Sequence, residues 1–203
     1  MRRLKSLGGA GLILFSIIAL QGCATGGGRG YVAGHLSPPA FGATALVVRP
    51  QIDGGGWHSP RTTEAQIHAA MADVLRQVPG TTVIDLPPSL RTIDLSDYQL
   101  VMAARKTGAR TVCVVTVDSI GSRVCLGVRI PPFWAGTFAN YNVRLLDVTT
   151  GKLLVDAARH DETFTFDCPP EHALLDMQRG LNGVLRRGGL LASAAKPSAA
   201  KPG

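Results

Sequence analysis

The stretch TVCVVTVD, residues 111–118, is a continuous run of mostly β-branched residues. A strand that is half exposed alternates apolar and polar residues, whereas this run shows no such alternation. It therefore predicts a strand that is buried on both faces, inside a layered fold.

Two capped helices are predicted before this strand. Thr63 with Gln66, and Ser96 with Gln99, form capping-box patterns, in which the paired side chains satisfy free backbone N–H groups. The apolar stripe of the first helix consists of Ile67, Met71, Val74, Leu75 and Val78. The second helix ends near Gly108, and the residues that share one of its sides are Tyr98, Val101, Met102 and Arg105.

Further strands and a third helix complete the pattern. The predicted strands are residues 43–48, 81–86, 123–130, 138–148 and 153–159, with turns at residues 119–122 and 149–152. The third helical stripe consists of Leu174, Gln178, Leu181, Val184 and Leu185. The order strand, helix, strand, helix, four strands, helix predicts one small α/β sandwich, with a mixed sheet of five to six strands and three helices.

The beginning of the chain has the features of an export signal. Three basic residues precede an apolar run at residues 12–20, which is too short to span a bilayer as a helix. Leu20-Gln21-Gly22-Cys23 resembles the bacterial lipobox, in which the cysteine sulfur is diacylated and the new amino terminus is acylated after cleavage. The resemblance implies a signal peptide over residues 1–22 and fatty acids such as palmitate on Cys23. An ordinary secretory signal with an incidental cysteine is the alternative.

Acylation would make Cys23 a membrane tether. Each acyl CH₂ contributes about 0.8 kcal/mol on insertion, so several chains hold a protein far more firmly than one. Ala24 and Thr25 lack the aspartate that retains lipoproteins in the inner membrane of enteric bacteria. By that resemblance we expect attachment to the periplasmic face of the outer membrane.

Composition divides the mature chain into three parts. Residues 23–40 are glycine-rich, which is typical of a flexible linker after the acylated cysteine. Residues 41–187 hold the predicted α/β domain, and residues 188–203 read as a disordered tail. Removal of residues 1–22 leaves 18 basic and 14 acidic residues, a net charge of +4. This modest charge, together with the export signal, argues against nucleic acid as a partner.

Three cysteines lie outside the lipobox: Cys113, Cys125 and Cys168. A hairpin that turns at Ser119 would set Cys113 opposite Cys125, so a disulfide between these two is one possibility in an oxidising compartment. Unpaired thiols are the other possibility.

No group of residues predicts catalysis, a metal site or a cofactor. Ser193-x-x-Lys196, Ser96-Asp97-Tyr98 and Lys106-Thr107-Gly108 resemble the three boxes of serine β-lactamases, but their order along the chain is scrambled. His160-x-Glu162 with Cys168-Pro169 resembles the zinc deaminase signature, but the second cysteine is missing. We therefore expect a protein that is not an enzyme.

Aromatic residues at two chain breaks are candidates for partner binding. Phe133 and Trp134 follow a rigid diproline, and an exposed tryptophan at such a place is typical of binding hot spots. Packing of both rings against the core is the alternative. Trp57 follows three glycines in a loop over residues 54–58 that could contact a ligand.

Two longer stretches resemble a family of bacterial envelope lipoproteins. AARKTGARTVCVVTVDSI, residues 103–120, is similar to their step from a helix through Gly-Ala into an apolar strand. YNVRLLDVTTGKLLVDAARHDE, residues 141–162, is similar to their Thr-Gly-Lys hairpin. The group includes CsgG, LpoB and the amino-terminal domain of TolB. The resemblance implies a small α/β fold that acts by binding other envelope proteins.

Together, these features predict a tethered, non-enzymatic lipoprotein that binds or helps to assemble another envelope component. Two alternatives stay open. One is a periplasmic lipoprotein that binds a small molecule or glycan through the loop at residues 54–58. The other is a CsgG-like secretion oligomer.

Overall fold

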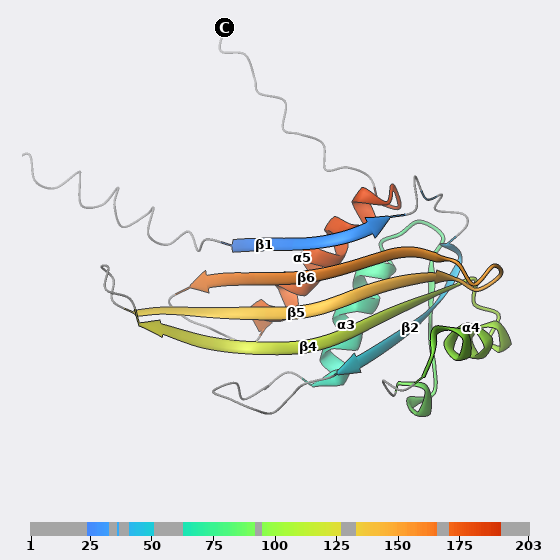
Figure 1. The fold of residues 1–203 in the computed structure, drawn as a ribbon, viewed down its shortest axis with the longest axis horizontal. Helices are drawn as coiled ribbons and strands as arrows, with labels where there is room; N and C mark the ends of the chain where they lie inside the picture. Colours follow the sequence, from blue (N-terminus) through green and yellow to red (C-terminus); the bar gives the residue numbers. More distant parts are fainter. Residues whose placement is uncertain are drawn as a thin grey trace, which may run out of the picture.

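The computed structural model describes residues 24–32, 36, 41–50, 63–91, 95–126, 133–165 and 171–191. Within these ranges the chain forms one mixed sheet of six strands, in the order β1-β6-β5-β4-β2-β3, packed against three α-helices (Figure 1). The predicted α/β class is therefore confirmed, together with its strand and helix numbers.

The strands differ in length and direction. β2 pairs in parallel with both β3 and β4, whereas β4, β5, β6 and β1 pair with one another antiparallel. Their bounds are β1 (Ala24–Val32), β2 (Ala43–Pro50), β3 (Thr82–Asp85), β4 (Thr111–Leu126), β5 (Phe133–Asp147) and β6 (Leu153–Thr165). The helices are α3 (Glu64–Leu75), α4 (Asp97–Lys106) and α5 (Glu171–Arg187), with a short 3₁₀ turn, η1 (Pro88–Leu90).

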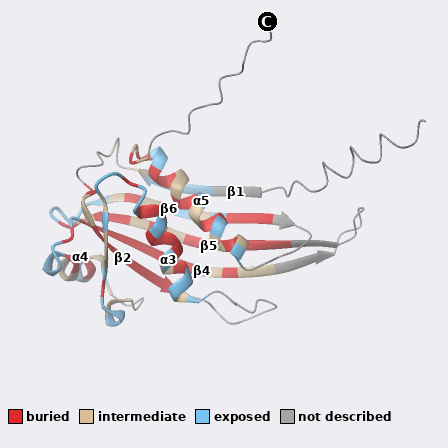
Figure 2. Ribbon diagram, turned by 180° about the vertical axis from the view of Figure 1, so that it is seen from behind, coloured by how far each residue is buried: buried red, intermediate tan, exposed pale blue. Residues whose placement is uncertain are grey.

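Helices lie on both faces of the sheet, and the sheet's buried residues therefore alternate between two cores. On one face α3 and α5 lie side by side (Figure 2), and on the other face α4 covers the end near β2. In β4, Cys113 and Val115 belong to the first core, and Val112 and Val114 belong to the second. All four side chains are fully buried, as the run at residues 111–118 predicts.

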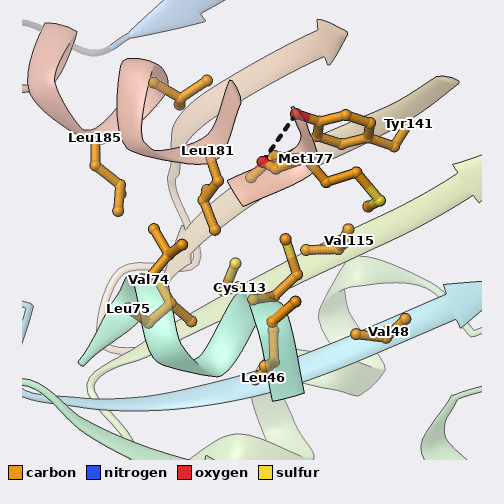
Figure 3. Packing of buried hydrophobic residues seen from close by; sticks show 14 of the residues in the cluster. Leu46, Val48, Val74, Leu75, Cys113, Val115, Tyr141, Met177, Leu181 and Leu185 are labelled. Atoms are coloured by element: carbon orange, nitrogen blue, oxygen red, sulfur yellow. Dashed lines mark hydrogen bonds between the residues drawn. The ribbon is translucent and has the colours of Figure 1, made fainter. Parts of the chain in front are cut away.

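The larger core lies between α3, α5 and the sheet (Figure 3). Met177 and Leu181 of α5 approach Val74 of α3 and Cys113 and Val115 of β4. Burial of each large apolar side chain contributes about 1.5–3 kcal/mol, so this layer supplies much of the stability of the fold.

The sequence correctly predicts where α3 and α4 begin. Both capping boxes are present, at Thr63 with Gln66 and at Ser96 with Gln99. The predicted stripe of α3 is buried in full. The stripe predicted for α4 is right only at Val101, because Tyr98 is 72% exposed and the other residues that the helix buries are Leu100 and Ala104. These smaller apolar residues fit closely over the sheet, where Tyr98 and the charged Arg105 do not.

The predicted turn at residues 119–122 is also wrong. β4 continues as one strand of 16 residues, so residues 123–126 extend it instead of starting a new strand. A bulge between Val117 and Ser119 absorbs one extra residue, and β5 remains the partner on both sides of it. A long neighbouring strand therefore keeps the chain extended where a local turn signal favoured reversal.

Residues 24–32 form strand β1, although composition assigns them to the flexible linker over residues 23–40. β1 pairs with β6 along its whole length, from Ala24 opposite Thr163 to Val32 opposite Val155. A Cβ atom at Gly28 would lie 2.5 Å from the carbonyl oxygen of Ala158, and one at Gly30 would lie 2.9 Å from the Cα of Ala157. Glycine here permits close strand contact, so the linker prediction is wrong for this segment.

The predicted disordered tail begins too early. Gly189 adopts a positive φ of 77°, and the backbone N–H of Leu190 returns to the carbonyl of Leu185, which closes α5 with a glycine cap. Leu190 is 1% exposed. Residues 188–191 are therefore part of the domain, and the rest of the predicted tail lies outside the described residues.

A buried polar cluster fixes α5 on the sheet. The Tyr141 hydroxyl lies 2.7 Å from Asp161 Oδ2 and 3.2 Å from the carbonyl oxygen of Met177, and Arg159 binds the same carboxylate through two nitrogens. Burial raises the pKa of Tyr141, and the negative charge of Asp161 raises it further. Burial alone would lower the pKa of Arg159, but its bond to Asp161 outweighs this effect and raises the pKa. Tyr141 therefore stays neutral and Arg159 stays charged.

Gly180 of α5 lies directly over this cluster. A Cβ atom there would overlap the Tyr141 hydroxyl and Asp161 Oδ2, and would lie 3.2 Å from Arg159 Nε. At Gly183, one turn later, the nearest atom to an added Cβ is the end of the Arg187 side chain, at 3.9 Å.

Gly180→Ala is therefore expected to destabilise the domain by about 1–3 kcal/mol, because α5 must move away from the sheet. Gly183→Ala is the matched control and should stabilise it by up to about 1 kcal/mol through helix propensity alone. Urea unfolding followed by circular dichroism measures both changes. Equal effects of the two substitutions would show that α5 does not approach the sheet in this way.

Candidate functional site

One face of the sheet is only partly covered by a helix. α3 and α5 lie on the far side of β4, β5 and β6 in Figure 1, and α4 packs on the near side beside the start of β4. We call the remaining near side of these three strands the open face. In the described part of the chain, no helix packs on it.

A row of polar side chains crosses the open face at right angles to the strands. Ser119 of β4 lies opposite Asn140 of β5, which lies opposite His160 of β6. The bulge after Val117 determines this register, because it brings Ser119 instead of Asp118 into the pair with Asn140. Together with Glu162, two residues further along β6, these residues form what we call the polar ladder.

Hydrogen bonds hold the polar ladder in one arrangement. Asn140 Nδ2 donates to Ser119 Oγ at 2.7 Å, and Asn140 Oδ1 lies 2.5 Å from His160 Nδ1. Because the amide oxygen can only accept, the ring nitrogen of His160 must be the donor. The other ring nitrogen lies 3.6 Å from Glu162 Oε2, and the His160 side chain is 52% exposed while that of Glu162 is 8% exposed.

The geometry of the polar ladder suits recognition better than catalysis. A serine nucleophile needs its hydroxyl next to a basic nitrogen, but here Asn140 stands between Ser119 and His160. Groups of three or more side chains that could hold a metal ion are absent from the described residues. The row offers a fixed set of hydrogen-bond donors and acceptors, with His160 exposed and Ser119 and Asn140 partly exposed.

A second polar group lies between the polar ladder and α4. Asn142 donates to Asp156 across β5 and β6 at 2.9 Å, and Arg144 pairs with Asp97 at the start of α4 at 2.8 Å. Arg49 at the end of β2 is 3% exposed and donates to the carbonyl oxygen of Leu95. Burial lowers the pKa of Arg49, and the nearby charge of Arg144 lowers it further. The contacts of Arg144 and Arg49 attach the start of α4 to the sheet, and the charged residues of this group border the open face.

The residues predicted for partner binding do not join the polar ladder. Phe133 and Trp134 are the first residues of β5, where their backbones pair with Leu126 and Cys125 at one end of the sheet. Trp57 and its glycine loop lie outside the described residues, as does Cys23, whose neighbour Ala24 begins β1. The sequence analysis singles out His160 and Glu162 as part of a motif. No sequence pattern around Ser119 or Asn140 indicates that these residues lie beside them.

The predicted disulfide between Cys113 and Cys125 is wrong. Both cysteines belong to β4, and twelve residues of extended chain separate them by about 40 Å, far beyond the reach of a disulfide. Cys113 is a free thiol in the core, and burial raises its pKa to about 12. The prediction depended on a hairpin at Ser119, which the continuous strand replaces.

Crossing a bilayer as a helix would require more length and apolar character than any helix in the described ranges has. No protein-family model matches the sequence, and no curated protein matches it.

Several solved structures are similar to this chain at low sequence identity. PelC from Paraburkholderia phytofirmans, crystallised as a dodecamer, is 14% identical with a TM-score of 0.55, over 84% of this chain and 100% of that chain. Lipoprotein GNA1162 from Neisseria meningitidis is 13% identical with a TM-score of 0.42, over 71% of this chain and 99% of that chain. The C-terminal domain of LpoB from Escherichia coli is 14% identical with a TM-score of 0.35, over 57% of this chain and 80% of that chain.

Of these three similarities, only the one to PelC is high enough to indicate a common fold. The comparisons do not place the chain in the particular group of CsgG, LpoB and TolB that residues 141–162 resemble. The comparisons concern the fold alone, and they do not indicate a role for the side chains of the open face.

The polar ladder predicts an unusual state for one histidine. When the ring of His160 is neutral, its proton is expected on Nδ1, because Asn140 Oδ1 accepts from that nitrogen. Long-range ¹⁵N–¹H NMR of the imidazole, at a pH where the ring is neutral, reports the tautomer directly.

Asn140→Ala should remove this tautomer preference, whereas Asn142→Ala, whose partner is Asp156, should leave it intact. A wild-type ring with its proton on Nε2 would contradict the arrangement of the ladder.

Proposed function

We propose that this protein is a lipoprotein of the bacterial outer membrane, held by acyl chains on Cys23, that binds or helps to assemble another envelope component without catalysis. The observation that carries the proposal is the open face with its polar ladder, a fixed set of hydrogen-bonding groups that no helix of the described chain covers. Such a surface can recognise a partner, and its groups are not arranged for chemistry.

The start of β1 supports the membrane tether. Cleavage between Gly22 and Cys23 would leave all six strands of the sheet intact, because the first strand begins at Ala24. Removal of a longer segment would take residues from the ladder between β1 and β6. The boundary suggested by the lipobox therefore agrees with the boundary of the fold.

The similarity to PelC supports an assembly role. PelC was crystallised as a dodecamer, and its whole chain aligns with this one. This favours a second candidate within the same role, in which the partner is a further copy of this chain and the product is an oligomer. The two candidates differ in what should be captured at the open face.

Acylation is tested at Cys23. In a bacterial host that processes lipoproteins, the mature protein should begin at Cys23, incorporate labelled palmitate and remain with the membranes. Cys23→Ser should lose the label and the membrane association, whereas Cys168→Ser should keep both. Mass spectrometry of the mature amino-terminal peptide identifies the modification, and an unmodified peptide would contradict the proposal.

Partner binding is tested at Ala158, an exposed residue of β6 that lies on the open face between Asn142 and Arg29. A photo-crosslinking amino acid at this position is expected to capture another envelope protein, or a second copy, in intact cells. The control places it at Asp73 of α3, which is exposed on the other side of the sheet. Immunoblotting and mass spectrometry identify the products, and the same products from both positions, or none from position 158, would contradict the proposal.

A further inference from the structure

The register of the sheet shows which end lies beside the proposed acylation site. Ala24, the residue after Cys23, pairs with Thr163 of β6. Thr163 pairs in turn with Thr137 of β5, and Thr137 pairs with Ser122 of β4. These four residues mark one level across the sheet, and β1 begins at this level, one residue after Cys23 in the sequence.

Two strands continue past this level. β4 runs on from Ser122 to Leu126, and β5 begins at Phe133, which pairs with Leu126. Four further residues of extended chain reach about 13 Å beyond Ala24. Figure 1 shows the paired ends of β4 and β5 projecting past the start of β1 on the same side of the molecule.

The residue types at this end differ from those at the opposite end. Past Ser122, β4 continues with Arg123, Val124, Cys125 and Leu126, and β5 begins with Phe133 and Trp134. At the opposite end, the hairpin between β5 and β6 contains Asp147, Thr149, Thr150 and Lys152, and the two threonines and the lysine are exposed. The end of the sheet at which β1 begins therefore carries the more apolar residues, and the opposite end carries the polar hairpin.

We propose that the paired ends of β4 and β5, residues 124–126 with Phe133 and Trp134, enter the headgroup region of the same membrane leaflet that holds the acyl chains. The occupant of this surface is a phospholipid bilayer. Tryptophan is favoured at that depth, where its ring meets both acyl chains and headgroups. The proposal rests on the acylation of Cys23 in the proposed function.

The length of the projection limits its depth. A strand needs roughly 9–11 residues to cross a bilayer, and the hydrocarbon core is about 30 Å thick. Four residues beyond the anchor reach into one leaflet and do not span the membrane. The domain would then contact the bilayer in two places, through the acyl chains before β1 and through the paired ends of β4 and β5. Two contacts fix its orientation and hold the hairpin at Asp147 away from the bilayer.

Tryptophan fluorescence tests this contact in the acylated protein. The sequence contains two tryptophans, so Trp57→Phe leaves Trp134 as the only one. The protein is placed in vesicles of phosphatidylethanolamine and phosphatidylglycerol, with or without brominated phosphatidylcholine. The emission of Trp134 is expected to shift to shorter wavelength on vesicle binding and to lose intensity with the brominated lipid.

Two controls separate the possible results. Trp134→Phe, which keeps Trp57, should show neither effect, and flotation of the vesicles shows whether the protein is bound. A protein that floats while Trp134 is not quenched overturns the contact but leaves the proposed function standing. A blue shift without quenching means that protein covers Trp134, and it overturns the contact too. A protein that is not acylated and does not float overturns both proposals.

Discussion

The burial of β4 on both faces over residues 111–115 is the constraint on which the rest of the fold depends. A segment that is apolar on both faces cannot lie at a surface, so it requires a layer of helices on each side and a paired strand along each edge. β2 and β5 supply the edges, α3 and α5 supply one layer, and α4 supplies the other. The mixed sheet follows, because β2 reaches β4 through helices while β5 follows it directly.

The position of α5 depends on a polar contact beneath the buried face of this amphipathic helix. Asp161 is buried, and it is tolerated because Tyr141 and Arg159 satisfy its oxygens. Gly180 removes the side chain that would otherwise separate the helix from this cluster. The cluster therefore defines where α5 sits, which a purely apolar interface would specify less sharply.

The glycine-rich start of the mature chain has a structural meaning in this fold. Gly28 and Gly30 allow β1 to lie close against β6, so the sheet begins at the residue after Cys23 without a flexible spacer. In the proposed acylated protein, so short a tether would keep the domain at the membrane surface. The direction of the strands would then matter for function, because one end of the sheet would face lipid and the other end would face the periplasm.

Local patterns in the sequence determined both capping boxes, the buried stripe of α3, the double burial of β4 and the hairpin after β5, because each depends on neighbours a few residues apart.

Only the tertiary structure decided the rest. Pairing with β6 turned a glycine-rich segment into β1, and pairing with β5 carried β4 through a predicted turn. The polar ladder arises the same way. Ser119, Asn140 and His160 lie far apart in the chain, and two irregularities in strand pairing, at Val117/Ser119 and at Leu145/Leu146, set which side chains meet. Contacts between distant segments leave no periodic trace in either segment alone.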